Sequence, residues 1–438
     1  MDVDKTTLND LSVFDHDDEY SIFNKLDFTR TVGGRESLKY IFSKTLASID
    51  EVNGVQQTLK LIIKNKVFWP EIITNGTMMV IQKFYESNID TIPHNASAPA
   101  AYSYKILHAP DFSLVKYSTG HCFDFIKGMQ QLIDNLLIEE APSSLKKLLN
   151  RAVNILNKEQ FHIVSKKTKA DDLTITSMLH LAHFFLYHYK QNIFELMDIY
   201  YQLDAWYSMA RAIEEHNLIF PVFVESDEPA IEAKDLYHIL LPHPVGYDIV
   251  LNPSCNFIFL TGANMAGKST FIKSIGAGVF LAHIGMGVPA VAMELTLFDG
   301  LLSNINVVDN IAKGESYFYN EVQRVKNTIL KINDGRKWLI LIDELFKGTN
   351  VQDAMKCSTT VIEGLIKIKN SLFILSTHLY EIGEALRTHS NISFKYFETI
   401  VDEEQFKFNY QLKDGISNDR LGYLILKREN VIDLLEKL

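Results

Sequence analysis

Residues 257–276 read FIFLTGANMAGKSTFIKSIG, an apolar run followed by glycines, a lysine and a hydroxyl pair. Within this stretch, Gly262 to Ser269 fit the pattern G-x-x-x-x-G-K-[ST], which follows a strand-like run and precedes a helical one. Glycines allow successive backbone amides to point at phosphate oxygens, and the start of the next helix adds a positive dipole end. The sequence therefore predicts a phosphate-binding loop inside an α/β fold.

Two side chains of this loop have predictable tasks. Lys268 is expected to neutralise the β and γ phosphates of a nucleotide, and the Ser269 hydroxyl to complete the coordination shell of Mg²⁺. A chance match in a turn is the alternative, and the flanking strand and helix argue against it.

Polar residues also end two later apolar runs. The run LILIDE ends in Asp343 and Glu344, where one carboxylate can serve the metal and the other can orient or deprotonate a water. The run LFILST leads to Thr377 and His378. Because ends of neighbouring parallel strands face one crevice, we expect His378 to contact the γ phosphate or the attacking water.

Composition limits the class of protein. The chain has 438 residues and a formal net charge of -11, which disfavours a protein that coats nucleic acid with its whole surface. Three widely spaced cysteines, an acidic start and the lack of an eighteen-residue apolar run predict a cytoplasmic protein that is neither secreted nor inserted in a membrane. A net negative charge does not exclude local basic strips that bind nucleic acid. Solvated helix faces and a loop are an equally good interpretation of these basic groups. The candidates are Lys146, Lys147 and Arg151, and Lys166, Lys167 and Lys169.

The first half of the chain has mainly helical patterns. The stretch SIDE, residues 48–51, has capping-box spacing before an apolar stripe, and a longer stripe covers residues 196–213. Residues 90–125 contain prolines and a polar stretch, which predict loops or an excursion from the helical body.

The second half reads as strands alternating with helices. Four short runs, YDIVL, NFIFLT, KWLILID and SLFILST, are expected to be buried parallel strands. After residue 391, two alternating segments predict an antiparallel pair joined near DEE. Between the phosphate loop and the run LILIDE, Gly314 to Ser316 precede a helical stripe. This helix start is expected to offer free amides to a phosphate or simply to cap the helix. We place the domain boundary near residue 230.

Four motifs together resemble the MutS mismatch-repair ATPases, within the ABC-type ATPases. They are the loop GANMAGKST, the signature GESYF, the acidic motif DELFKGTNVQDA and STH, in this order and spacing. The stretches LDFTRTVGGRESLKYIFSKTLASIDEVNGVQQTL, YYQLDAWYSMARAIEEHNLIFPVF and LLPHPV resemble the lever domain and its junction with the ATPase, while residues 65–190 match weakly. The resemblance implies an α/β P-loop (ABC-type) ATPase domain, residues 231–438, preceded by a mainly α-helical lever domain, residues 1–230.

The resemblance also implies roles for single residues. ATP would be bound by the residues Gly262, Asn264, Gly267, Lys268, Ser269 and Thr270, with Tyr410 against the adenine or, as nearly equal alternatives, in the core or a hairpin. Ser269 and Asp343 would serve Mg²⁺, and Glu344 would be the catalytic carboxylate. His378 would sense the γ phosphate, and Ser316 would act in trans on the partner's site, which implies a homodimer.

The chain also departs from the family pattern. We expect it to lack the mismatch-reading and connector domains, to have a reduced or absent clamp, and to keep only short dimerisation helices over residues 421–438. Ala263, Tyr317 and Lys347 replace a usual proline, threonine and arginine.

The leading hypothesis is a MutS-like ATPase that couples ATP-driven dimer closure to lever movement. DNA binding is expected to be directed by DNA structure or backbone rather than by a mismatch. The alternative is an ATP-switched scaffold for a protein or RNA partner, and a small-molecule kinase is a weaker third reading because no acceptor site is evident.

Overall fold

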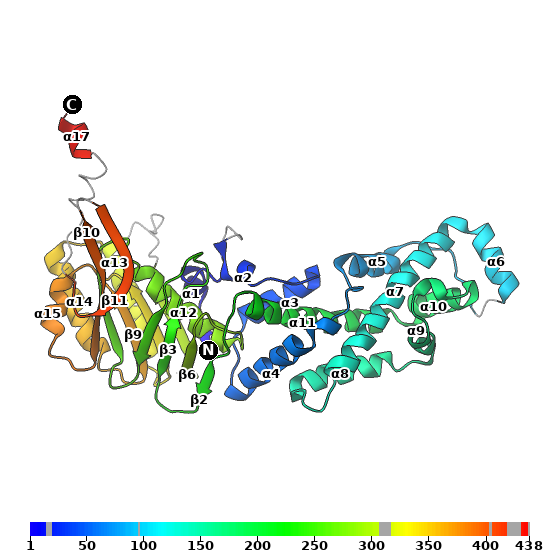
Figure 1. The fold of residues 1–438 in the computed structure, drawn as a ribbon, viewed down its shortest axis with the longest axis horizontal. Helices are drawn as coiled ribbons and strands as arrows, with labels where there is room; N and C mark the ends of the chain where they lie inside the picture. The colour runs from blue at the N-terminus through cyan, green and yellow to red at the C-terminus, as the bar shows by residue number, and fades with distance from the viewer. Residues whose placement is uncertain (15–19, 95–96, 306–316, 403–404, 418–430, 437–438) are drawn as a thin grey trace. The chain divides into compact units, whose positions relative to one another are not determined.

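The computed structural model describes residues 1–14, 20–94, 97–305, 317–402, 405–417 and 431–436, which form two compact units (Figure 1). One unit, here the sheet unit, comprises Met1–Lys25, Thr45–Val52 and His216–Leu438. The other, the helical unit, comprises Leu26–Lys44 and Asn53–Glu215. The sheet unit thus includes early residues that the boundary near residue 230 assigned to the helical half. The assignment of the units as lever and ATPase domains stays a prediction.

The helical unit is built from helices. Its helices are α3 (Val32–Ser43), α4 (Ile49–Asn65, whose first residues belong to the sheet unit), α5 (Asn75–Glu86), α6 (Ala98–Leu107), α7 (Ala109–Leu136), α8 (Ser143–Leu156), α9 (His162–Lys166), α10 (Ile175–His188) and α11 (Lys190–Glu215). Two expectations are confirmed. Ser48 accepts a hydrogen bond from the Glu51 amide at the start of α4, and α11 contains the stripe 196–213. None of the described helices is both long and apolar enough to cross a lipid bilayer.

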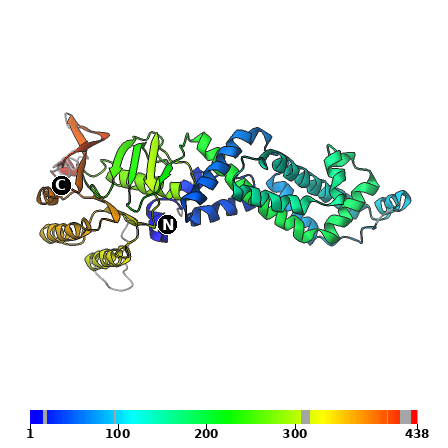
Figure 2. The same ribbon diagram turned by 90° about the horizontal axis from the view of Figure 1, so that it is seen from below.

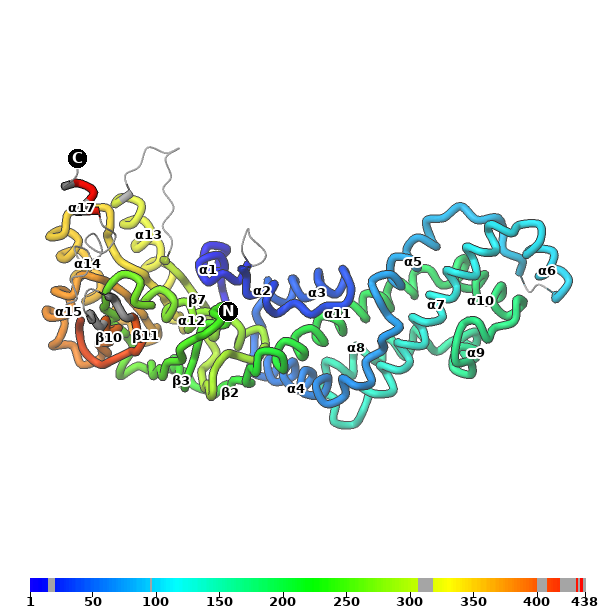
Figure 3. The backbone as a smooth tube through the Cα atoms, turned by 45° about the horizontal axis from the view of Figure 1, so that its top comes forward, coloured from blue at the N-terminus to red at the C-terminus, as the bar shows by residue number. Residues whose placement is uncertain are grey.

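The expectation of loops over residues 90–125 is wrong for most of that segment. Residues 98–107 and 109–125 lie in α6 and α7, and α7 runs beside α10 (Figure 3). Pro99 and Pro110 occupy the first turns of the two helices, where a missing amide proton and a fixed φ cost nothing. The prolines therefore mark helix starts rather than breaks.

A buried carboxylate joins α11 to the start of α3. The Asp204 side chain accepts hydrogen bonds from the amides of Arg30 and Thr31 and from the Thr31 hydroxyl. Gly34 is required beside it, because a Cβ at that position would lie 2.0 Å from Asp204 Oδ2. This contact fixes α3 against the last long helix of the helical unit.

The sheet unit contains a seven-stranded sheet in the order β1-β7-β8-β9-β5-β10-β11. Its strands are β1 (Asp2–Val3), β5 (Phe257–Thr261), β7 (Gly300–Asn304), β8 (Trp338–Asp343), β9 (Ser371–Ser376), β10 (Ile392–Asp402) and β11 (Gln405–Asp414). All neighbours pair in parallel except β10 and β11. The predicted parallel strands β5, β8 and β9 and the predicted antiparallel pair are therefore confirmed.

The seven-stranded sheet has helices on both faces. Ile340 and Ile342 of β8 belong to the core that includes residues of α13 (Tyr317–Ile332), α14 (Val351–Leu365) and α15 (Tyr380–Leu386). Leu341 points the other way, to Gly276 of α12 (Lys268–His283). Figure 2 shows α13 and α14 side by side on their face, in yellow and orange. The order of strands and helices on two faces is that of a doubly wound α/β fold.

A second sheet covers the other side of α12. It has four strands in the order β2-β6-β3-β4, namely β2 (Val222–Val224), β6 (Ala292–Thr296), β3 (Ile231–Leu236) and β4 (Tyr247–Leu251). Gly278 of α12 faces Leu236 and Met293 of this sheet. Because α12 is enclosed between two sheets, it is apolar around most of its circumference.

The expectation that YDIVL is a parallel strand of the main sheet is wrong. This segment is β4, which pairs antiparallel with β3 in the four-stranded sheet. Asp248 and Val250 are exposed, so β4 has one solvated face, which is typical of antiparallel strands. The apolar composition of YDIVL did not reveal that buried and exposed side chains alternate along β4.

The first residues of the chain extend the main sheet. Strand β1 pairs in parallel with β7, and α1 (Lys5–Asp10) follows it directly. Thr7 Oγ1 accepts a hydrogen bond from the Ser303 amide, and Asp10 Oδ2 accepts from the Ser303 hydroxyl and the Ile305 amide. The amino-terminal segment thus fixes the carboxyl end of β7. The remaining described helices of the sheet unit are α2 (Ile22–Lys25) and α17 (Val431–Glu436).

Candidate functional site

The loop predicted to bind phosphate connects β5 to α12. Gly262 has a φ of 144° and Gly267 a φ of 106°, a region that side chains with a Cβ rarely adopt. At Gly262 a Cβ would also lie 3.3 Å from Phe397 of β10. Asn264 lies exposed on this loop, and Thr270 is half-buried in the first turn of α12. Both glycines are therefore required by backbone geometry.

Lys268, the first residue of α12, is buried inside the loop. Its ammonium donates hydrogen bonds to the carbonyl oxygens of Gly262 at 2.8 Å and Ala263 at 3.0 Å. Burial lowers the pKa of Lys268, while the nearby carboxylates of Glu344 and Asp343 act in the opposite direction. Two of the three ammonium protons are used by the loop, which leaves one for a ligand.

Asp343 lies at the end of β8 and binds hydroxyl groups from two other elements. Ser269 Oγ of α12 donates to Asp343 Oδ2 at 2.5 Å, and Ser376 Oγ of β9 donates to Oδ1. Hydroxyl and carboxylate oxygens are ligands that Mg²⁺ prefers. Ser269 and Asp343, predicted from separate motifs, therefore meet at one point that could hold a divalent cation.

Ser376 is a site residue that the sequence interpretation missed. It is fully buried and pairs with Asp343 in the register of β8 and β9. A signal was present, because the run LFILST ends in two hydroxyl residues at the sheet edge where Asp343 was expected. Ser376 faces the carboxylate of Asp343, and Thr377 accepts a hydrogen bond from the Leu379 amide.

Glu344 lies between two cationic or potentially cationic groups. His378 Nδ1 is 3.0 Å from Glu344 Oε1, and Lys347 Nζ is 3.0 Å from Oε2. Burial alone would raise the pKa of Glu344, but the hydrogen bonds from His378 and Lys347 outweigh it and lower the pKa to about 2. Glu344 also has a left-handed φ of 61°. The carboxylate is therefore ionised at neutral pH and held in one orientation.

Tyr410 lies beside the glycine-rich loop because of an irregularity in the hairpin of β10 and β11. The register passes from the pair Phe397–Leu412 to the pair Thr399–Phe408, so three residues of β11 lie opposite one of β10. Tyr410 is the middle one, with a φ of 54°. A Cβ at Gly267 would lie 3.3 Å from Tyr410 Cδ1. Tyr410 is 41% exposed, and its ring is stacked with that of Phe408 at a centroid distance of 6.3 Å.

Ser316 lies outside the described residues, which resume at Tyr317, the start of α13. One turn further along, Glu321 is 4% exposed and was not predicted as a site residue. Its carboxylate accepts hydrogen bonds from the Lys347 amide at 3.0 Å and the Gly348 amide at 3.1 Å. The sequence contained one clue to this role. Glu321 follows Phe318 by three residues, so it lies on the same side of the helix as the apolar stripe.

Glu321 connects α13 to the segment that follows the acidic pair. The backbone of Lys347 is held by Glu321, and the side chain of Lys347 contacts Glu344. Phe318 and Phe346 pack nearby with ring centroids 5.7 Å apart. A displacement of α13 would therefore be transmitted to Glu344 through Lys347.

The converged side chains come from three strand ends. The glycine-rich loop follows β5, the pair of acids ends β8, and His378 follows β9, which lies between the other two strands. Two ammonium groups, two carboxylates and one imidazole thus surround one edge of the sheet. This set can bind an anion and a divalent cation, and can orient a water between them.

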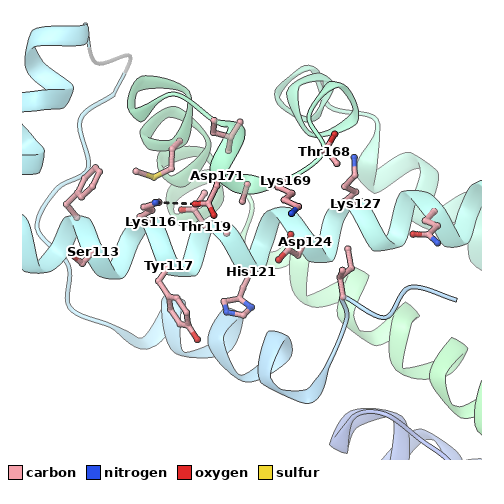
Figure 4. Close-up of a pocket in the computed structure, with 17 residues that line it drawn as sticks. Ser113, Lys116, Tyr117, Thr119, His121, Asp124, Lys127, Thr168, Lys169 and Asp171 are labelled. Carbon is pink, nitrogen blue, oxygen red and sulfur yellow. Dashed lines mark ion pairs between the residues drawn. The ribbon is translucent and has the colours of Figure 1, made fainter.

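A sizeable cavity of the protein lies elsewhere. It lies in the helical unit, has a volume of about 840 Å³ and is lined mainly by residues of α7 and of the segment 168–173 (Figure 4). Lys116 and Asp171 form an ion pair across it at 3.2 Å, and Lys127 donates to the carbonyl oxygens of Val164 and Lys167. Volume alone therefore does not identify the functional site.

Comparison with known proteins gives a consistent result. Residues 258–432 match the sequence model of MutS domain V. DNA mismatch repair protein spellchecker 1 of Drosophila melanogaster is 29% identical over 237 residues, which are 52% of this chain and 26% of that protein. DNA mismatch repair protein MutS of Petrotoga mobilis is 27% identical over 292 residues, which are 64% of this chain and 34% of that protein. The matched part is therefore about a quarter to a third of these relatives' length.

The role of Glu321 can be tested by hydrogen exchange. Replacing Glu321 with alanine removes the acceptor of two amides, so exchange at Lys347 and Gly348 should become about tenfold faster or more. Glu321→Gln keeps an acceptor oxygen and should have a smaller effect. The exposed Glu363→Ala on α14 is the matched control. Unchanged protection of both amides in Glu321→Ala would show that Glu321 does not hold this segment.

Proposed function

This chain belongs to the MutS family, and on that premise we propose that its sheet unit binds and hydrolyses ATP. The observation that carries the proposal is the meeting of Lys268, Ser269 and the acidic pair at one sheet edge. These groups come from segments about 75 residues apart, as the separation of 74 between Ser269 and Asp343 illustrates. A chance phosphate-loop match would not bring a hydrolytic set with it.

The triphosphate would lie along the loop from Gly262 to Thr270. Amides of this loop and of the first turn of α12 would donate to phosphate oxygens, with Asn264, Gly267 and Thr270 lining the path. Lys268 supports this role, because its ammonium is fixed by two loop carbonyls and has one proton left for the β and γ phosphates.

The residues present fit Mg²⁺. A hydroxyl and a carboxylate already face each other at 2.5 Å, and Ser376 fixes the other carboxylate oxygen. Ser269 and Asp343 would hold the ion, with waters and phosphate oxygens completing the shell. When bound, Mg²⁺ would neutralise charge on the phosphates.

Glu344 is the proposed catalytic carboxylate. With a pKa of about 2 it stays ionised at neutral pH, and such a weak base suits orientation of a water by hydrogen bonding. His378 contacts Glu344 through Nδ1 at 3.0 Å. Its second ring nitrogen, Nε2, would be the atom that reaches the γ phosphate.

The nucleobase is proposed to stack on Tyr410. A partly exposed tyrosine beside the loop supports this position, since an adenine extends from the end of the phosphate chain. A structural role in the hairpin is the alternative for this ring.

We propose a head-to-tail homodimer in which Ser316 of one subunit completes the ATP site of the other. Glu321 supports a mechanical link, because it joins the helix that follows Ser316 to the segment that holds Glu344. ATP would close the dimer, hydrolysis would reopen it, and the helical unit would act as the lever, with the clamp reduced or absent.

DNA is the proposed substrate of the helical unit, since the relatives are DNA mismatch repair proteins by name. Of the two basic strips, Lys146 donates to the Glu139 carbonyl and Arg151 is paired with Glu195. The side chains of Lys166, Lys167 and Lys169 form no ion pair among the described residues. We therefore assign phosphate contacts to the second strip, with recognition of DNA backbone or structure rather than of a mismatch.

Hydrolysis tests the catalytic assignment. Glu344→Gln should lower kcat for ATP about 100-fold or more while ATP still binds, because the water loses its orienting carboxylate. Lys268→Met should weaken ATP binding itself. Glu363→Gln, an exposed control, should keep the full rate. If Glu344→Gln hydrolyses ATP at an unchanged rate, Glu344 is not the catalytic carboxylate.

Mixing of variants tests the shared site. Ser316→Arg and Lys268→Met should each be inactive alone, but their mixture should recover about a quarter of the activity. Half of the dimers are then mixed, and each of these has one intact site of two. Steady-state hydrolysis at constant total protein measures the recovery. A mixture as inactive as its components would argue against action in trans.

Salt dependence tests the DNA proposal. Changing Lys166, Lys167 and Lys169 together to glutamine should weaken binding to duplex and branched DNA at every sequence. It should also reduce the slope of log K against log salt by up to about 3. The matched control changes Lys146, Lys147 and Arg151 to glutamine. Failure of the unmodified protein to bind any DNA, with or without ATP, would favour a scaffold for a protein or RNA.

A further inference from the structure

A second cluster of metal-ligand side chains lies in the helical unit. Asp90 belongs to the segment after α5, His108 precedes α7, and Asp111 is in the first turn of α7. One ligand atom of each residue, an imidazole nitrogen and two carboxylate oxygens, lies within 4.8 Å of the other two. The cluster is separate from the sheet unit and takes no part in the ATP site.

The three groups are held in place by contacts that begin at Asp90. His108 Nδ1 is 2.8 Å from Asp90 Oδ2, and the Asp90 amide donates to Asp111 Oδ2 at 3.2 Å. Tyr104 donates to the Asp90 carbonyl at 3.3 Å and stacks on the His108 ring. The Asp90 side chain is 66% exposed, yet its amide, carbonyl and carboxylate all have partners. The ligand groups are therefore largely arranged before any ion binds.

Simpler roles explain only parts of this arrangement. An acid in the first turn of α7 favours the helix dipole, which accounts for Asp111. An exposed ion pair accounts for Asp90 and His108, and such a pair contributes little to stability. Neither role requires both carboxylates to approach the same imidazole.

Three further imidazoles belong to the same part of the helical unit and serve as the comparison group. The ring centroid of His183 on α10 lies 4.7 Å from that of His94 and 5.4 Å from that of His188. Centroid distances of about 4.5–7 Å are ordinary for packed rings, so these histidines are treated as a packing contact and not as ligands. The segment from Asp90 to His94 supplies a residue to each group.

We propose that Asp90, His108 and Asp111 bind one divalent transition-metal ion of the zinc class, with water in the remaining position. The imidazole nitrogen selects against Mg²⁺ and Ca²⁺, which take oxygen ligands in larger number. Two carboxylates balance the charge of the ion. Three protein ligands and one water form the tetrahedral arrangement that zinc accepts.

Equilibrium dialysis of the nucleotide-free full chain against Zn²⁺ tests the proposal. The same titration on Asp343→Asn separates this site from cation binding in the sheet unit. One ion per chain should remain bound in Asp343→Asn, and an equal concentration of Mg²⁺ should not displace it. His108→Gln and Asp111→Asn should each lower the affinity at least about tenfold. The side-chain oxygen that Asp111→Asn retains can still accept from the Asp90 amide, so this variant should keep its fold.

Two controls make the result decisive. Asp171→Asn removes an exposed acid of the same unit and should leave the affinity unchanged. His183→Gln should also leave it unchanged, and X-ray absorption should find one nitrogen ligand among oxygens. The proposal is overturned if the unmodified protein takes up no stoichiometric Zn²⁺. It is equally overturned if only His183→Gln loses the ion, which would assign binding to the histidine group. Far-UV circular dichroism of each variant verifies the fold.

Discussion

The carboxylate of Asp343 is the point on which the site depends, because its two oxygens bind hydroxyls from two different elements. One hydroxyl comes from the first turn of α12 and the other from the end of β9. These two hydrogen bonds fix the distance between the glycine-rich loop and the acidic pair. The two segments are far apart in the sequence, so chain connectivity does not set this distance. Hydrogen bonds to a buried charge contribute about 1.5–3 kcal/mol each, so this geometry is stable without a ligand.

The adjacent acids of the pair therefore differ in environment although they are neighbours in the sequence. Asp343 is bound by neutral hydroxyls, which a metal ion can share. Glu344 is bound by an imidazole and an ammonium, which hold its pKa at about 2. Glu344 reaches this position through a left-handed backbone conformation, a cost that is typical of functional sites. The environment of each acid thus matches a different task.

Motif and strand order made much of the site predictable. Buried parallel strands are continuous apolar runs, so β5, β8 and β9 could be found, together with the polar residues that end them. Ser376 and Glu321 were missed because their roles depend on strand register and on a helix packing against a distant loop. The place of Tyr410 beside Gly267 depends on a three-residue bulge, which leaves no mark in an alternating sequence. Prolines in the first turns of α6 and α7 were taken for loop residues, although position decides their effect.

The pairing of β1 with β7 means that the sheet unit is assembled from separate stretches of the chain. Residues 26–44 and 53–215 form the helical unit between them. A fragment that begins at residue 216 would lack the outermost strand and the two side chains that fix Ser303, leaving the edge of β7 open to pairing with other chains. The sheet unit thus cannot be cut out or exchanged at one junction. Its boundary is defined by the three-dimensional packing and not by one position in the sequence. A domain exchange must therefore include the first residues of the chain.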